Sequence, residues 1–184
     1  MATTFVEIAN RAITFLGGEP ITALTDDTKE GRSCNRLYEQ TRDQLLRDHH
    51  WNFAIKRASI AANTTAPLYE YTNAYDFPDG CLKIIDVEAT EEWFVEGRQI
   101  VTDQGAPLKI VYINRVTDPN LFDAKFIETY SMRLAADIAY DITASQTVAA
   151  QAEQKFAALM QAARLSDAQE SMEAKSLSWL ESRL

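Results

Sequence analysis

The chain has 184 residues, 27 of them acidic and 18 basic, and a formal net charge of −9. This length fits one domain with a core large enough to fold without metal or disulfide staples. The negative charge disfavours a conventional DNA-binding module, because binding to phosphate backbones depends on lysine and arginine. The sequence predicts neither a membrane span nor a signal peptide, so we expect a soluble protein folded in the cytosol.

Two helices are predicted before residue 50. Thr4 and Glu7 form a capping-box pattern, and apolar residues at helical spacing follow, which predicts a helix at about 4–16 that ends at Gly17. Thr28 can cap a second helix at about 28–49, with an apolar stripe along one side.

From Trp51 the apolar period changes from helical spacing to two, which is typical of strands. Strands are predicted at 51–55, 69–77, 81–87, 93–95, 99–101 and 108–116. Glu96 and Gly97 suit a tight hairpin between the fourth and fifth of these. Their order along the chain predicts a small antiparallel meander.

Two further helices are predicted after the strands. The segment 119–143 carries the strongest helical stripe, and either Asp118-Pro119 or Asp123 opens this helix. An alanine-rich helix at about 146–165 is expected to pair with it in antiparallel fashion. The remaining segment, 166–184, either extends this last helix or detaches from it. The predicted fold is α+β, with a four-helix bundle and an inserted antiparallel β-meander at about 51–116. We expect one domain spanning 1–184.

Sequence signatures of catalysis are absent: the chain has no phosphate-binding loop, no zincin motif and no nucleophile elbow. His49 and His50 are adjacent, so they point in different directions on a helix end, and a helix-dipole role is favoured over metal binding. Cys34 and Cys81 lack CxxC spacing and are interpreted as buried thiols. We therefore predict no catalytic residue, cofactor or metal.

Asp137 and Asp141 lie one helical turn apart, with Glu128 expected on the same broad side. Such carboxylates could serve in acid–base catalysis or bind a divalent metal. A solvated acidic face opposite the apolar stripe is the favoured interpretation. Asp26 and Asp27 are similarly interpreted as loop and cap residues.

The aromatic residues of 69–77 also allow two interpretations: a stacking platform for a sugar or nucleotide, or the core of a small sheet. The core is favoured, because large aromatic side chains need no ligand to account for them. In contrast, Leu177, Trp179, Leu180 and Leu184 have no obvious partner within the chain. Tryptophan is enriched at interface hot spots, so these four residues are predicted to dock on another protein.

Several segments together resemble the podovirus tail tubular protein A family, the head-to-tail adaptors. The resemblance lies in Ile8 to Gly17 (IANRAITFLG), 37–54 ending in DHHWNFA, 75–82 (YDFPDGCL), 95–100 (VEGRQI), 112–123 (YINRVTDPNLFD), Phe126 and 133–137 (RLAAD). It covers most of the chain except about the last twenty residues.

The resemblance implies a structural virion protein of the tail neck, assembled in the host cytoplasm, and not an enzyme. Such adaptors form a dodecameric ring beneath the portal protein, extend the DNA channel and seat the tail nozzle protein. Genomic DNA would pass through the lumen without specific binding, since acidic side chains lining it would repel phosphates. The predicted docking residues would then contact the portal or a neighbouring subunit.

Two alternatives of other classes remain open. One is a small carboxylate-dependent cell-wall hydrolase that uses Asp137 with Asp141 or Glu128. The other is a different oligomeric helical connector protein, against which the strands predicted at 51–116 argue.

Overall fold

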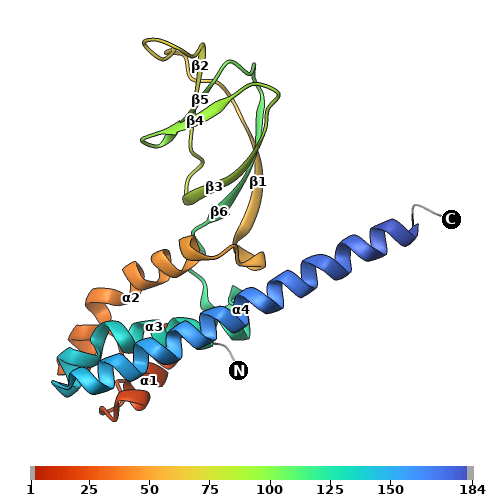
Figure 1. The fold of residues 1–184 in the computed structure, drawn as a ribbon. Coiled ribbons are helices and arrows are strands. Elements are labelled where there is room, and N and C mark those ends of the chain that lie inside the picture. Colours follow the sequence, from red (N-terminus) through yellow and green to blue (C-terminus); the bar gives the residue numbers. More distant parts are fainter. Residues whose placement is uncertain (1–2, 182–184) are drawn as a thin grey trace. The chain divides into compact units, whose positions relative to one another are not determined.

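A computed structural model describes the backbone of residues 3–181 and the side chains of 3–166. Within the chain, for which we expected one domain, the residues group into two compact units: Met1–His49 with Thr117–Leu184, and His50–Val116. The first unit is helical and the second consists mainly of strands, so the fold class is α+β (Figure 1). No helix in the described part of the chain is both long and apolar enough to cross a membrane.

The first two helices begin at the caps that the sequence predicts. In α1 (Phe5–Leu16), the Thr4 hydroxyl accepts from the Glu7 N–H at 3.2 Å, while the Thr4 N–H donates to the Glu7 carboxylate at 3.0 Å. Gly17 ends α1 in the left-handed region, with φ of 73°. In α2 (Lys29–Asp48), the Thr28 hydroxyl accepts from the third residue of the helix. Both helices are confirmed within one residue of their predicted bounds.

Helix α3 (Ala124–Thr143) is the element on which the other helices of this unit pack. It contacts α1, α2 and α4, whereas α1 and α2 contact each other little. Of the two predicted starts, Asp118-Pro119 is wrong and Asp123 is confirmed: Pro119–Leu121 form a short 3-10 turn, and α3 begins after the cap Asp123. The buried core around α3 consists of Ala9, Ala12, Ile13, Leu16, Ile21, Cys34, Met132, Leu134, Ala135, Ile138, Ala139 and Ala152.

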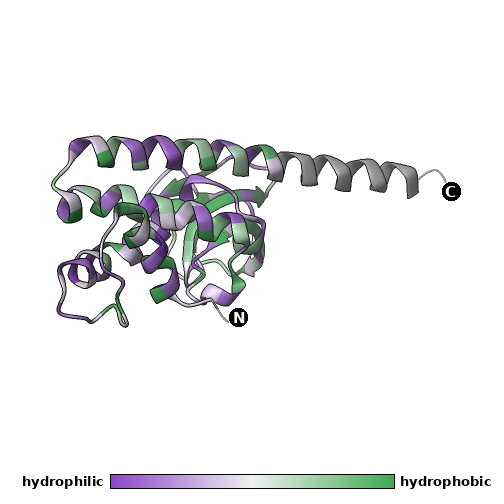
Figure 2. Cartoon of the chain, turned by 90° about the horizontal axis from the view of Figure 1, so that it is seen from below, coloured by the Kyte–Doolittle hydropathy of each residue, from purple (hydrophilic) through white to green (hydrophobic). Residues whose placement is uncertain are grey.

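Helix α4 (Gln146–Glu181) continues well beyond the predicted end at 165, so residues 166–181 extend the helix. Residues 166–181 contain neither glycine nor proline, and nothing in this stretch stops a helix. Along its described part, apolar side chains such as Ala152 and Met160 are buried, and hydrophilic residues separate them (Figure 2).

The second unit contains two three-stranded antiparallel sheets and not the predicted single meander. Their strand orders are β1-β6-β3 and β2-β5-β4. The strands are β1 (Ile55–Ile60), β2 (Asn73–Asp76), β3 (Cys81–Glu88), β4 (Trp93–Glu96), β5 (Gln99–Thr102) and β6 (Leu108–Asn114). The predicted hairpin is confirmed, since Glu96 pairs with Gln99 across Gly97, which has φ of 59°.

Two strand predictions in this unit fail at their starts. Residues Asn52–Ala54 form a 3-10 helix, and the strand begins only at Ile55. Of the segment 69–77, only Asn73–Asp76 is a strand. Both sheets contribute to a core made of Tyr75, Cys81, Val87, Ile100, Leu108, Ile110 and Tyr112.

Candidate functional site

The predicted docking residues fall at the far end of α4. Leu177, Trp179 and Leu180 belong to 167–181, whose side chains lie outside the described residues, and Leu184 lies beyond the described backbone. Their role in docking stays a prediction.

Asp137 and Asp141 make contacts with α2. Asp137 accepts a hydrogen bond from the Thr41 hydroxyl at 2.8 Å and is ion-paired with Arg133 at 2.9 Å; its side chain is only 20% exposed. Asp141 forms an ion pair with Arg36 and is 40% exposed. A fully solvated acidic face is therefore wrong for Asp137, because α2 brings a donor to it that helical spacing within α3 could not reveal.

Glu128 does not join this pair. It precedes Asp137 by about two and a half turns of helix, which places it on the opposite side of α3, and it is exposed. The expected common side for Glu128 and the two aspartates is thus wrong.

A hollow of about 290 Å³ lies beside Asp137 and is lined by residues of α2 and α3, namely Leu37, Gln40, Thr41, Gln44, Arg133 and Asp137. The carboxylate that would act in it already accepts from a hydroxyl and a guanidinium. A general acid–base pair needs carboxylates that can exchange protons with a substrate. Asp137 and Asp141 are instead suited to joining α3 to α2, through Thr41 and Arg36.

Arg133 connects α3 to α4. Its guanidinium lies 3.3 Å from the Glu153 carboxylate and 5.2 Å from the centre of the Phe156 ring. The same guanidinium is paired with Asp137 of α3. Arg133 therefore contacts one carboxylate on α3, one carboxylate on α4 and the face of an aromatic ring on α4. The predicted pairing of the third and fourth helices is confirmed.

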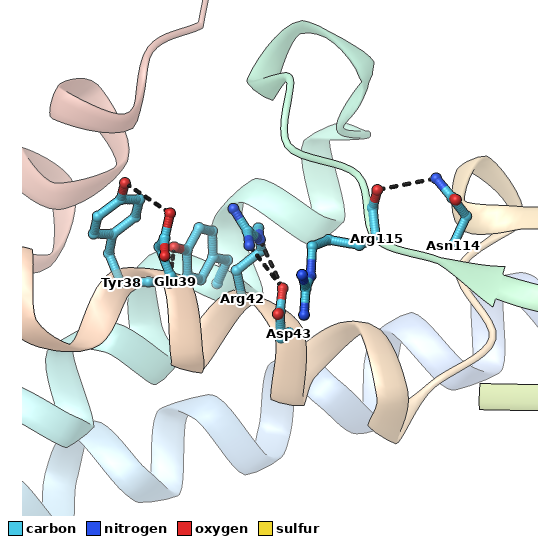
Figure 3. Close-up of polar contacts among 7 residues, drawn as sticks. Tyr38, Glu39, Arg42, Asp43, Asn114 and Arg115 are labelled. Atoms are coloured by element: carbon cyan, nitrogen blue, oxygen red, sulfur yellow. Dashed lines mark hydrogen bonds and ion pairs between the residues drawn. The ribbon is translucent and has the colours of Figure 1, made fainter. Parts of the chain in front are cut away.

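Among the residues of the helical unit whose side chains are described, Arg42 of α2 carries the most buried charge, with its side chain 4% exposed. Its guanidinium donates to the Asp43 carboxylate from two nitrogens, at 2.8 and 2.9 Å (Figure 3). Nearby, the Tyr130 hydroxyl donates to the backbone carbonyl of Tyr38, and the Tyr38 hydroxyl donates to Glu39 at 3.3 Å. The bond from Tyr130 joins α3 to α2, and the buried guanidinium of Arg42 is paired within α2, so buried polar groups here have partners.

Burial shifts the acidity of two groups in this core. It raises the pKa of the Tyr130 phenol far above its usual range, against an opposing effect of Arg42. Burial and the negative charge of Glu30 raise the pKa of the Cys34 thiol to about 11. Both groups are therefore neutral at physiological pH, and the thiol is a poor nucleophile. The interpretation of both cysteines as buried free thiols is confirmed.

The remaining polar residues singled out from the sequence have local roles. Asp26 accepts from the backbone N–H groups of Thr22 and Ala23, and these bonds lower the pKa of its carboxyl. Asp26 is thus a loop residue, as predicted. His49 is the C-cap of α2. Among residues with described side chains, no group of three or more histidine, cysteine or acidic residues could hold a metal ion.

The aromatic segment divides between core and surface. Tyr75 is fully buried, as the core interpretation predicts, whereas Leu68 is fully exposed and Tyr69 is 75% exposed. The rings of Tyr71 and Phe94 lie 5.7 Å apart, and Phe94 is 52% exposed. An open hollow of about 540 Å³ adjoins them, lined largely by the loop at 63–71.

The sequence prediction missed this surface around β4. Acidic residues surround its aromatic pair: Glu91, Glu92 and Glu96 are all exposed. The pattern of glutamates flanking Trp93-Phe94-Val95 was visible in the sequence, but the alternation that marks a strand does not tell which neighbour covers it.

The chain matches no family model, and no curated protein matches its sequence.

Proposed function

We propose that this chain is a head-to-tail adaptor of a tailed-phage particle. It docks beneath the portal protein as a dodecameric ring, extends the DNA channel and seats the tail nozzle protein, while DNA passes without specific binding. The proposal rests on the resemblance of the sequence segments to the tail tubular protein A family, and it makes the chain a structural virion protein of the tail neck.

One structural observation supports the proposal most directly. A β unit, His50–Val116, is inserted between helices that pack together through α3. Two segments that carry the resemblance span the junctions of this insert: 48–54 covers its start and 112–123 covers its end. We infer that the four helices form the bundle of an adaptor and that the insert is its characteristic addition.

The arrangement of the carboxylates also fits a structural role. Asp137 and Asp141 are engaged by Thr41, Arg133 and Arg36, so their charges serve contacts between helices. A protein that acts by assembly needs such rigid helix packing and no exposed reactive group.

We propose that the end of α4 carries the docking contact with the portal or the neighbouring subunit, through Leu177, Trp179, Leu180 and Leu184. The helix continues to Glu181, well past Ala163, the last buried residue described in it. An amphipathic helix can lay its apolar residues into a groove of another chain.

The decisive experiment mixes the chain with its cognate portal protein and images the product by electron microscopy. A stoichiometric ring of this chain beneath the portal is the expected result. Failure to form any complex with the portal, under conditions where both proteins are folded, contradicts the adaptor function.

The docking role is tested in the same assay with chains that keep their fold. Truncation after Ala168, or alanine at Leu177, Trp179 and Leu180, should abolish joining. Alanine at Glu170 and Lys175 is the matched control, because it changes polar residues of the same segment. Normal joining by the truncated chain would reject the assignment.

A further inference from the structure

The two small sheets of the β unit end in strands that are hydrogen-bonded on one side only. In the sheet β2-β5-β4, strand β4 pairs only with β5, and in the sheet β1-β6-β3, strand β1 pairs only with β6. A free edge presents unpaired backbone N–H and C=O groups, which can pair with a strand of another chain. What decides the partner is the charge that each edge carries.

Strand β4 carries negative charge along its free edge. Glu92 directly precedes β4 and continues the alternation of Phe94 and Glu96, so these three residues share one face, and all three are exposed. Among the described residues, neither glutamate side chain has an ion-pair partner. We call β4 with Glu92 and Glu96 the acidic edge.

The nearby Arg98 does not neutralise the acidic edge. Its guanidinium donates to the Cys81 carbonyl at 3.1 Å and lies over the Phe77 ring. Burial and the charges of four carboxylates, Glu70, Glu92, Asp103 and Glu96, raise the pKa of Tyr71, which lies against Phe94. The potential around this edge is therefore negative.

Strand β1 carries the opposite charge. Lys56 and Arg57 are consecutive, so their side chains lie on opposite faces of β1, and both are exposed. Among the described residues, neither makes an ion pair. We call β1 with these two residues the basic edge. The two remaining edges differ from these: β3 mixes Lys83 with acidic residues, and the one charged residue of β2, Asp76, accepts hydrogen bonds from Asn63 and Gln99.

These charges determine which edges can pair. Charged residues on an edge strand normally prevent pairing, since like charges placed opposite one another repel. Two acidic edges repel each other, and so do two basic edges, so symmetric contacts between copies are opposed. Of these two edges, the acidic edge of one copy and the basic edge of another attract.

We propose that the acidic edge of one copy of this chain binds the basic edge of the next copy, β4 against β1, in a head-to-tail contact between β units. Such a contact uses different surfaces on the two copies, so it can propagate from copy to copy into a closed ring or an open chain. The inference deepens the proposed function and rests on it for the ring, but the contact itself can be measured without the portal.

Charge reversal tests the contact with the full chain alone. One variant combines Glu92→Lys with Glu96→Lys, so both of its edges are basic. The other combines Lys56→Glu with Arg57→Glu, so both of its edges are acidic. Sedimentation velocity over a range of concentrations measures self-association, and circular dichroism confirms that each variant is folded.

Each variant alone should self-associate at least about tenfold more weakly than the wild-type chain, because like charges now face each other. An equal mixture of the two variants should regain association, since the altered edge of each then faces an oppositely charged edge. The chain with all four substitutions should regain it as well. Added salt should weaken the association of the wild-type chain.

Three results would overturn the contact: a wild-type chain that stays monomeric at every concentration, variants that associate as the wild type does, or a mixture that fails to regain association. The portal experiment separates this failure from that of the adaptor function. Rings that form on the portal equally well with every variant refute the edge contact and leave the adaptor function standing. Charge-dependent self-association without portal binding supports the edge contact and refutes the adaptor function.

Discussion

Replacing Asp137 by alanine should destabilise the helical unit by about 1–4 kcal/mol. Thr41 is 1% exposed, and its hydroxyl donates to Asp137 at 2.8 Å. A buried hydroxyl that loses its partner costs about 1–3 kcal/mol. The partly exposed ion pair with Arg133 adds up to about 1 kcal/mol.

Two further substitutions separate these contributions. Asp137→Asn keeps an oxygen for the Thr41 hydroxyl and removes the charge, so it should cost about 1 kcal/mol or less. Thr41→Val removes the hydroxyl itself, so the additional loss from Asp137→Ala should then fall by about 1–2 kcal/mol. The double-mutant cycle therefore measures the bond between α2 and α3.

The assay is urea unfolding followed by far-ultraviolet circular dichroism, which reports on the helical unit because all four α-helices belong to it. Removing a catalytic carboxylate commonly leaves stability unchanged or raises it, since active sites trade stability for function. Unchanged or higher stability of Asp137→Ala would refute the structural role and favour the acid–base interpretation.

The packing of the helical unit predicts three further outcomes: the stability losses of two substitutions and the reactivity of one thiol. Gly31→Ala should lower the free energy of unfolding by more than about 1 kcal/mol, because the new Cβ would lie 2.4 Å from the backbone oxygen of Asp26. Gly105→Ala is the control: the space around Gly105 is open, so its loss of stability, measured by thermal unfolding of both variants, should be far smaller. Asn10→Ala should cost about 1–3 kcal/mol, because Asn10 bonds both the N–H and the carbonyl of buried Ile21 at 2.8 Å; stability equal to wild type would contradict this. The Cys34 thiol, with a pKa of about 11, should resist a disulfide reagent at pH 8 until denaturant is added, and rapid labelling of the folded chain would show the site to be open.

Local signals in the sequence predicted the helices well. The bounds of α1 and α2 follow from side chains that bond to neighbours three residues away, as at Thr4 and Glu7. These interactions are complete within a few residues, so no tertiary partner alters them. At the start of α3, by contrast, both Pro119 and Asp123 suit a helix start, and the cap at Asp123 is the one that α3 uses.

The sheets were harder to predict because pairing is not local. Strand β6 lies between β1 and β3, so its partners are far from it in sequence. Alternation of Trp51, Phe53 and Ile55 suggested a strand, yet three positions cannot distinguish an alternating strand from a 3-10 turn that precedes one.

The same limit applies to the candidate site. The spacing of Asp137 and Asp141 fixed their relation to each other along α3, but the donors that engage them come from α2. No pattern within a single helix encodes the residue that a neighbouring helix will present. The exposure of Phe94 in β4 was missed for a similar reason, since nothing in the strand reveals that no second neighbour covers it.

The central place of α3 has a consequence for the order in which the chain folds during synthesis. Helices α1 and α2 contact each other little, and both pack on α3, which leaves the ribosome only after the entire segment His50–Val116. The apolar stripes of α1 and α2 therefore stay exposed to solvent until α3 is synthesised, while the β unit, which is continuous in sequence, can complete its own core first. The discontinuous helical unit closes last, when α3 arrives and α4 folds back along it.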